Sequence, residues 1–191
     1  KTPRTNLQFL SFFESVIRGV YEHHALLMAS IASLSNMYRL GGHEAPPAVM
    51  SVFIGETLTR LVESIEKLTS KNLTSVSDKE VKVRSKLHIV NQIPEISPDN
   101  TDRNRTSPFA FTGNRFEFRA VGSSCNVASS MFILNGVVAE QLERFKKLVD
   151  AGIADGLSQD KAMMKIIRQF LIESRDIRFE GNGYSAEWQM E

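Results

Sequence analysis

The stretch that decides the fold is residues 109–120, FAFTGNRFEFRA. At its centre stands Thr112-Gly113-Asn114, a sequence typical of tight turns, with alternating or apolar residues on both sides. We therefore predict two short strands, Phe109–Phe111 and Arg115–Ala120, joined as a hairpin. A hairpin next to long amphipathic helices indicates an α+β fold, in which short antiparallel strands pack with several helices.

The second strand of this hairpin has two unlike faces, because alternate residues of a strand share a side. Phe116 and Phe118 are predicted to face the core, and Arg115, Glu117 and Arg119 to project together from the other face. Two interpretations stay open. The row is a ladder of surface ion pairs, worth roughly 0.2–1 kcal/mol each. Alternatively it is an anion site whose carboxylate stays ionised and can hold a cation such as Mg²⁺.

Two further arginines, Arg103 and Arg105, lie just before the hairpin. Four guanidinium groups that converge from one hairpin repel one another unless an anion compensates their charge. Their number favours the anion site, and a polyphosphate with its metal ion is the candidate ligand.

The remaining chain is predicted to be mainly helical. An apolar stripe at helical spacing follows a capping box with Thr5 as the N-cap, and an interruption is expected near Gly19 or at His23-His24. The predicted helices cover residues 5–32, 56–68, 127–148 and 158–174, and further strands are predicted at residues 48–55 and 83–90.

Two segments are predicted to lack regular structure. Residues 38–47, YRLGGHEAPP, contain two glycines and two prolines and carry Arg39, His43 and Glu44, so this loop is a candidate functional site. Residues 69–82 are polar and are predicted to form an exposed connection.

Composition narrows the class of protein. The 191 residues suffice for one sizeable core, and a net charge of +1 gives no overall field that would attract nucleic acid.

Cys125 is the only cysteine, which excludes an internal disulfide and fits a cytoplasmic protein. We expect it to be a small core residue rather than a nucleophile, and His23 and His24 to be ordinary, partly buried side chains. No apolar run reaches the roughly 18–20 residues of a membrane span.

Longer motifs carry a family resemblance. Residues 103–140, from RNRTSPF to GVVAE, resemble the catalytic core of glutamine synthetase, and residues 38–56 resemble its glutamate flap. The sequences of these two segments and of residues 1–13, KTPRTNLQFLSFF, are similar to the large type III bacterial branch of the family. The resemblance implies that residues 1–191 form the later half of the catalytic domain, without its first part and without the N-terminal β-grasp domain.

The resemblance also implies an activity. Members of the family phosphorylate the γ-carboxylate of glutamate with ATP, and ammonia then displaces the phosphate to give glutamine, ADP and phosphate. The implied cofactors are ATP and Mg²⁺ or Mn²⁺, and the implied assembly is a homo-oligomeric ring. The fragment alone is expected to be inactive, since two-metal chemistry needs several ligands.

Six residues match the family's functional motifs. The resemblance implies glutamate binding by Arg39 and Arg119, flap closure and proton acceptance by Glu44, contact with the transferring phosphoryl group by Arg105, nucleotide binding by Arg105 and Arg115, and metal ligation by Glu117.

Two departures from the family pattern and two alternatives remain. Ala110 stands where many relatives carry a second arginine, and His43 stands at an aromatic position of the flap. The first alternative is a related γ-glutamyl-amine ligase with the same core. The second is a non-catalytic fragment that acts as an interaction module.

Overall fold

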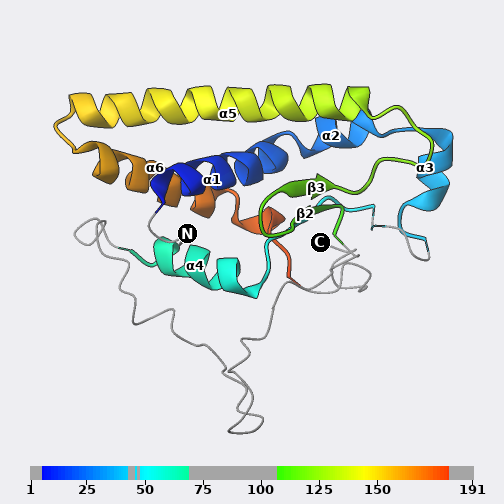
Figure 1. Ribbon diagram of the computed structural model, residues 1–191, viewed down its shortest axis with the longest axis horizontal. Helices are drawn as coiled ribbons and strands as arrows, with labels where there is room; N and C mark the ends of the chain where they lie inside the picture. Colours follow the sequence, from blue (N-terminus) through cyan, green and yellow to red (C-terminus); the bar gives the residue numbers. More distant parts are fainter. Residues whose placement is uncertain (1–5, 43–45, 47, 69–106, 181–191) are drawn as a thin grey trace, which may run out of the picture.

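The computed structural model describes residues 6–42, 46, 48–68 and 107–180. Figure 1 shows the long helix α5 (Ala128–Ala154) along one side of the molecule. Helices α1 (Leu7–Glu22) and α6 (Gln159–Glu173) form the next layer, and α4 (Glu56–Glu66) lies on the far side, against α6. Several predictions fall outside the described residues: the strand at 83–90, the connection at 69–82, and the positions of Glu44 and Arg105.

The first predicted helix is two helices. Its N-cap is Asn6, whose side-chain oxygen accepts a hydrogen bond from Phe9 N at 3.0 Å, so the prediction of Thr5 as N-cap is wrong by one residue. Helix α1 ends at Glu22, and α2 (His24–Ser30) follows after a single non-helical residue, His23. The interruption therefore falls at the second of the two expected places.

A short helix that the sequence did not predict follows. Helix α3 (Leu34–Arg39) begins after Ser33, whose hydroxyl accepts a hydrogen bond from Asn36 N at 3.1 Å. Arg39 therefore lies in the last turn of a helix and not in a loop, which corrects the predicted start of the loop at residue 38. The chain turns at Gly41, whose positive φ of 78° suits glycine.

The predicted hairpin is present. Strand β2 (Phe109–Phe111) pairs antiparallel with β3 (Phe116–Phe118), and Thr112 N donates to Arg115 O at 2.9 Å across the turn. Gly113 adopts a φ of 96°, as the turn requires. The α+β class and the hairpin are thus confirmed.

The third strand makes the sheet mixed rather than wholly antiparallel. Strand β1 (Val52–Phe53), much shorter than the predicted 48–55, pairs parallel with β2. The connection from β1 to β2 passes through α4, and a crossover of this kind brings the chain back in the same direction. The expectation of antiparallel strands therefore holds for one of the two pairs.

Helix α5 is longer than predicted, and its buried face matches the predicted one only in part. It continues through Gly152 to Ala154, and the chain leaves it at Gly156 with a φ of 89°. The sequence predicts one apolar side at Met131, Leu134, Val138, Leu142, Phe145 and Leu148. Of these, Phe145 is buried, Leu134 and Leu148 are partly buried against the core, and Met131 is 57% exposed. The residues that are buried are Ser130, Val137, Gln141, Phe145 and Val149.

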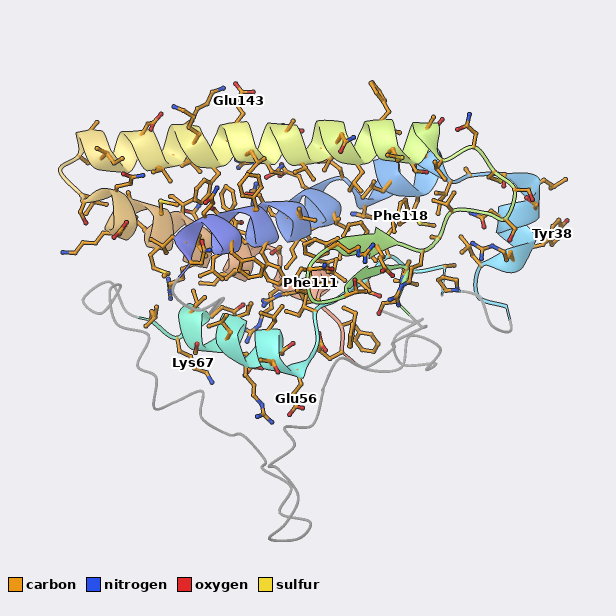
Figure 2. All side chains as sticks on the ribbon, in the orientation of Figure 1. Tyr38, Glu56, Lys67, Phe111, Phe118 and Glu143 are labelled. Atoms are coloured by element: carbon orange, nitrogen blue, oxygen red, sulfur yellow. The ribbon has the colours of Figure 1, made fainter. Side chains whose placement is uncertain are left out.

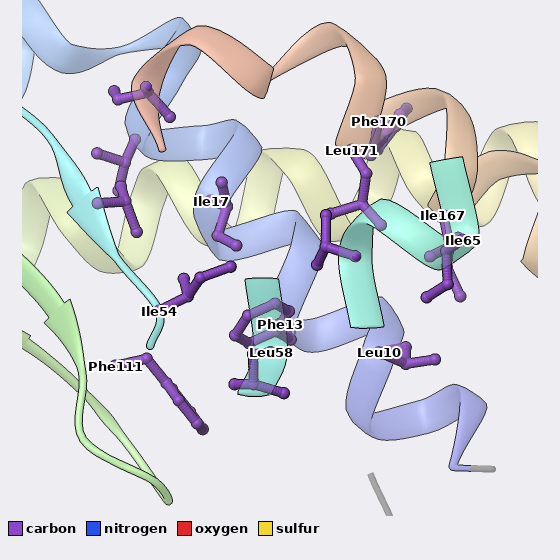
Figure 3. Packing of buried hydrophobic residues seen from close by; sticks show 14 of the residues in the cluster. Leu10, Phe13, Ile17, Ile54, Leu58, Ile65, Phe111, Ile167, Phe170 and Leu171 are labelled. Atoms are coloured by element: carbon purple, nitrogen blue, oxygen red, sulfur yellow. The ribbon is translucent and has the colours of Figure 1, made fainter. Parts of the chain in front are cut away.

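The core lies between the helix layer and the sheet. Figure 3 shows Phe13 and Ile17 of α1 directed toward Leu58 of α4 and Phe111 of β2. The rings of Phe13 and Phe111 meet edge to face with their centroids 5.3 Å apart. Aromatic contacts therefore fasten the hairpin to the first helix, and they fix where the opposite face of the hairpin points.

Cys125 is exposed and lies before α5, so the expectation of a core position is wrong. It belongs to the segment that joins β3 to α5, where the chain runs over the surface. His23 is partly buried, as expected, whereas His24 is exposed. None of the helices in the described ranges combines the length and the apolar character that a membrane crossing needs.

Candidate functional site

The hairpin brings Glu117 and Arg119 together. Arg119 Nε donates to Glu117 Oε2 at 3.3 Å, and the hydroxyl of Thr112 donates to Glu117 Oε1 at 3.2 Å. Both side chains are partly exposed, 41% for Glu117 and 24% for Arg119. Because two donors hold the carboxylate, its orientation is set before any ligand binds.

The aromatic residues on the other face explain this orientation. The rings of Phe116 and Phe118 lie 5.4 Å and 5.9 Å from the ring of the fully buried Phe109. The alternating pattern of the strand then directs Glu117 and Arg119 to the opposite side. The predicted division of β3 into an apolar and a charged face is confirmed for these four residues.

Arg115 stands apart from this pair. It lies at the end of the turn, is exposed, and donates from Nε to Asn114 Oδ1 at 3.4 Å. Its side chain thus bonds to its own neighbour, so the predicted row of three is a pair with an exposed arginine beside it.

Arg39 reaches the same region from another element. At the end of α3, its Nε donates to Asn36 Oδ1 at 3.0 Å and its NH2 group to Val121 O at 3.1 Å. Val121 comes two residues after Arg119, so α3 and the end of β3 meet where both arginines are anchored. Figure 1 shows the chain running from β3 toward α3.

The start of the hairpin is tied to its end at this place. Arg119 N donates to Pro108 O at 2.7 Å, which extends the β2–β3 pairing by one bond. Of the six predicted site residues, the structure therefore brings Arg39, Glu117 and Arg119 into one region, with Arg115 at its exposed side. Glu44 and Arg105 lie outside the described residues.

The described residues offer few metal ligands. Within residues 6–42, 46, 48–68 and 107–180, no three His, Cys, Asp or Glu side chains gather in a way that could hold an ion. Glu117 fits as one carboxylate ligand of a hard cation such as Mg²⁺, which prefers oxygen. Further ligands would have to come from elsewhere.

Sequence reasoning missed two residues of this region. Thr112 was assigned to the turn alone, although its hydroxyl holds Glu117. Asn36 was not considered at all, although it is 2% exposed and contacts Arg39. Its spacing from Arg39 gives a signal only where a helix is predicted at residues 34–39, because residues three apart share a helix face.

Comparisons with known proteins find similarity to glutamine synthetases. Residues 162–191 match the glutamine synthetase C-terminal domain. The chain is 48% identical over 192 residues to a glutamine synthetase of Bacteroides fragilis (strain YCH46), covering 100% of the chain and 26% of that relative. It is 40% identical over 188 residues to the type-3 glutamine synthetase of Dictyostelium discoideum, covering 98% of the chain and 24% of the relative. A glutamine synthetase of Butyrivibrio fibrisolvens is 35% identical over 190 residues, with 98% and 25% covered.

The chain is therefore similar along nearly its whole length to proteins named glutamine synthetase, one of them a type-3 enzyme, and it spans about a quarter of the length of these relatives.

Proposed function

We propose that the protein to which this chain belongs ligates ammonia to glutamate with ATP, through a γ-glutamyl phosphate intermediate, and releases glutamine, ADP and phosphate. The observation that carries the proposal is that Arg39 is anchored on the carbonyl of Val121, two residues after Arg119, which itself pairs with Glu117. The similarity of nearly the whole chain to relatives named glutamine synthetase supports it. In this proposal the enzyme is cytoplasmic and assembles as a homo-oligomeric ring.

The residue types suit the reaction. Phosphoryl transfer depends on positioning and on neutralising the charge of the phosphate oxygens, which arginines and metal ions provide. In the proposal Arg119 binds the glutamate substrate beside the phosphoryl group, and the exposed Arg115 binds the nucleotide. Arg39 supplies a planar guanidinium that suits a carboxylate.

The proposed metal would supply the charge that draws electron density from the transferring phosphoryl group. Glu117 would be one oxygen ligand for Mg²⁺ or Mn²⁺, and its pair with Arg119 keeps its carboxylate group directed away from the aromatic core. In the proposal Arg105 steadies the transferring phosphoryl group, and Glu44 closes over the site and takes a proton from ammonium.

The test is phosphate release by the full-length protein with glutamate, ammonium and ATP. We expect Arg119→Ala and Glu117→Ala each to lower turnover by about 10³-fold, the scale of losing a group that stabilises the transferring phosphoryl. Arg144→Ala is the matched control, because Arg144 is exposed and pairs with Glu22 in the helix layer. Unchanged turnover of Glu117→Ala would remove Glu117 from the metal site. If turnover were faster with another amine than with ammonium, that amine and not ammonia would be the acceptor.

A further inference from the structure

Asn36 is a buried amide whose polar atoms all have partners. Its Nδ2 group donates to Ile31 O at 3.0 Å and to Ala120 O at 2.8 Å, and its Oδ1 accepts from Arg39 Nε at 3.0 Å. A single side chain thus joins the loop before α3, the residue that follows Arg119, and Arg39 itself.

These contacts hold the guanidinium of Arg39 at two points. Asn36 takes the Nε–H, and the carbonyl of Val121 takes one N–H of the NH2 group. Among the described residues, these two groups accept the hydrogen bonds of the Arg39 guanidinium, which has five N–H donors. The two bonds fix the plane of the group while other donors stay available to a ligand.

We propose that Asn36 is a positioning residue that orients Arg39 toward the carboxylate of the glutamate substrate. The inference rests on the proposed function, and it adds a residue that touches no substrate. Without the amide oxygen, Arg39 keeps its charge but loses the bond that sets the direction of its fork. Positioning errors of this kind weaken bidentate recognition of a carboxylate, which depends on geometry as well as on charge.

A second buried amide shows what a purely structural contact of this type looks like. Gln141 is fully buried and accepts from Arg18 NH1 at 2.6 Å. Arg18, however, is itself 6% exposed and is enclosed by Glu22 and Glu173. Arg39 is only half-buried, so the amide beside it holds an arginine that a ligand can reach.

The experiment measures glutamate and ATP kinetics of the full-length protein with Asn36→Ala, Arg39→Ala and the double variant. We expect Asn36→Ala to raise KM for glutamate about 10-fold, the scale of one hydrogen bond to a charged group, and to leave KM for ATP unchanged. In the Arg39→Ala background, Asn36→Ala should cause no further loss of kcat/KM for glutamate, because its effect passes through Arg39.

Asn36→Asp separates positioning from stability. Aspartate keeps an oxygen for Arg39 Nε but places its other oxygen against the carbonyls of Ile31 and Ala120. We expect this variant to be at least as destabilised as Asn36→Ala, with a KM for glutamate closer to that of the wild type. A merely structural role would make KM follow stability in both variants. Gln141→Ala is the control, with a lowered melting temperature and an unchanged KM for glutamate.

Two results would overturn the proposed role of Asn36 and leave the proposed function standing. One is a folded Asn36→Ala variant with the wild-type KM for glutamate, and the other is additivity of the Asn36 and Arg39 effects on kcat/KM. A wild-type protein that releases no phosphate with glutamate and ammonium would instead overturn the proposed function, and this inference with it. The wild-type assay therefore tells the two failures apart.

Discussion

The helix layer and the site region both hold an arginine against a buried amide, and they use it differently. In the helix layer, Arg18 lies 4.2 Å over the ring of Phe170 and bonds to Gln141, Glu22 and Glu173. In the site region, Arg39 bonds to one amide and one carbonyl and remains half-buried. Because Arg18 is enclosed, it links α1 to α5 and α6. Because Arg39 is only partly enclosed, it stays available to a ligand.

Because the two arginines differ in enclosure, we expect substitutions at different residues to change stability and activity. Figure 2 shows side chains gathered densely between α5, α1 and α6, while Tyr38 of α3 points away from the body of the molecule. Met37 and Tyr38 are exposed, and so is Phe132 near the start of α5. We expect changes in the helix layer to alter unfolding, and changes of the partly exposed Glu117 and Arg119 to alter catalysis with little effect on unfolding.

The largest effect on stability is expected for Arg18→Ala. This change leaves the carboxylate of Glu173, the amide of Gln141 and part of Glu22 without their shared partner inside the helix layer. Glu22 and Glu173 are each 36% exposed, so the cost comes mainly from the buried amide of Gln141, which loses its donor, and from the lost contact with the ring of Phe170. Together these should cost about 2–4 kcal/mol. Urea unfolding measures the loss, and Arg144→Ala, which removes an exposed partner of Glu22, should cost below about 1 kcal/mol. Equal losses in the two variants would contradict the contrast between the regions.

A smaller effect is expected where α1 and α5 approach most closely. A Cβ added at Gly19 would come within 2.8 Å of Val137 Cγ1, and Val137 is buried and stiff. Gly19→Ala should therefore cost about 1–3 kcal/mol through overpacking. The matched control is Gly136→Ala, because a Cβ at Gly136 meets nothing within 4 Å. That control should gain up to about 1 kcal/mol from helix propensity, measured by thermal unfolding.

A pH effect is expected from Glu14, which is 1% exposed in α1. Burial raises the pKa of Glu14 well above its usual range, although the hydroxyl of Ser15 and the charge of Arg18 act in the opposite direction and Glu173 adds to the rise. The folded state therefore holds a proton that the unfolded state releases near the ordinary carboxyl pKa. The free energy of unfolding should fall as pH rises from that value through the raised pKa.

Glu14→Gln removes the titratable carboxyl group and should flatten the pH dependence of the free energy of unfolding over the same interval. Denaturant titrations at several pH values measure the slope. An unchanged slope in the variant would show that another group causes the pH dependence.

The smallest effect on stability is expected for Glu117→Ala. Its ion pair with Arg119 is partly exposed, and pairs of this kind contribute at most about 1 kcal/mol. The melting temperature should therefore shift by only a few degrees, while turnover falls by the large factor expected above. A strong loss of stability would place Glu117 among the structural residues of the hairpin.

Local patterns explain what could be predicted from the sequence. The turn at Gly113 and the alternation around Phe116 and Phe118 gave the hairpin and its charged face, because both depend on residues close in the chain. The whole buried face of α5 could not be predicted in this way. Its buried position at Gln141 is polar, and it is occupied by glutamine because Arg18, 123 residues away, supplies the partner.

The candidate site divides in the same manner. Motif similarity identified Arg39, Glu117 and Arg119 as candidates, and the strand pattern paired Glu117 with Arg119. Asn36 escaped notice because no helix was predicted at residues 34–39, so its spacing from Arg39 carried no signal, and because its bond to the carbonyl of Ala120 spans 84 residues. No pattern within one helix indicates such a bond.

Sequence patterns alone indicate the long helices, the hairpin and the residue types that can bind phosphate and carboxylate groups. The tertiary structure decided which arginines are enclosed and which stay open to a ligand. The physical reason is that burial, and with it the role of a charged side chain, depends on segments far apart in the chain that meet only when the core forms.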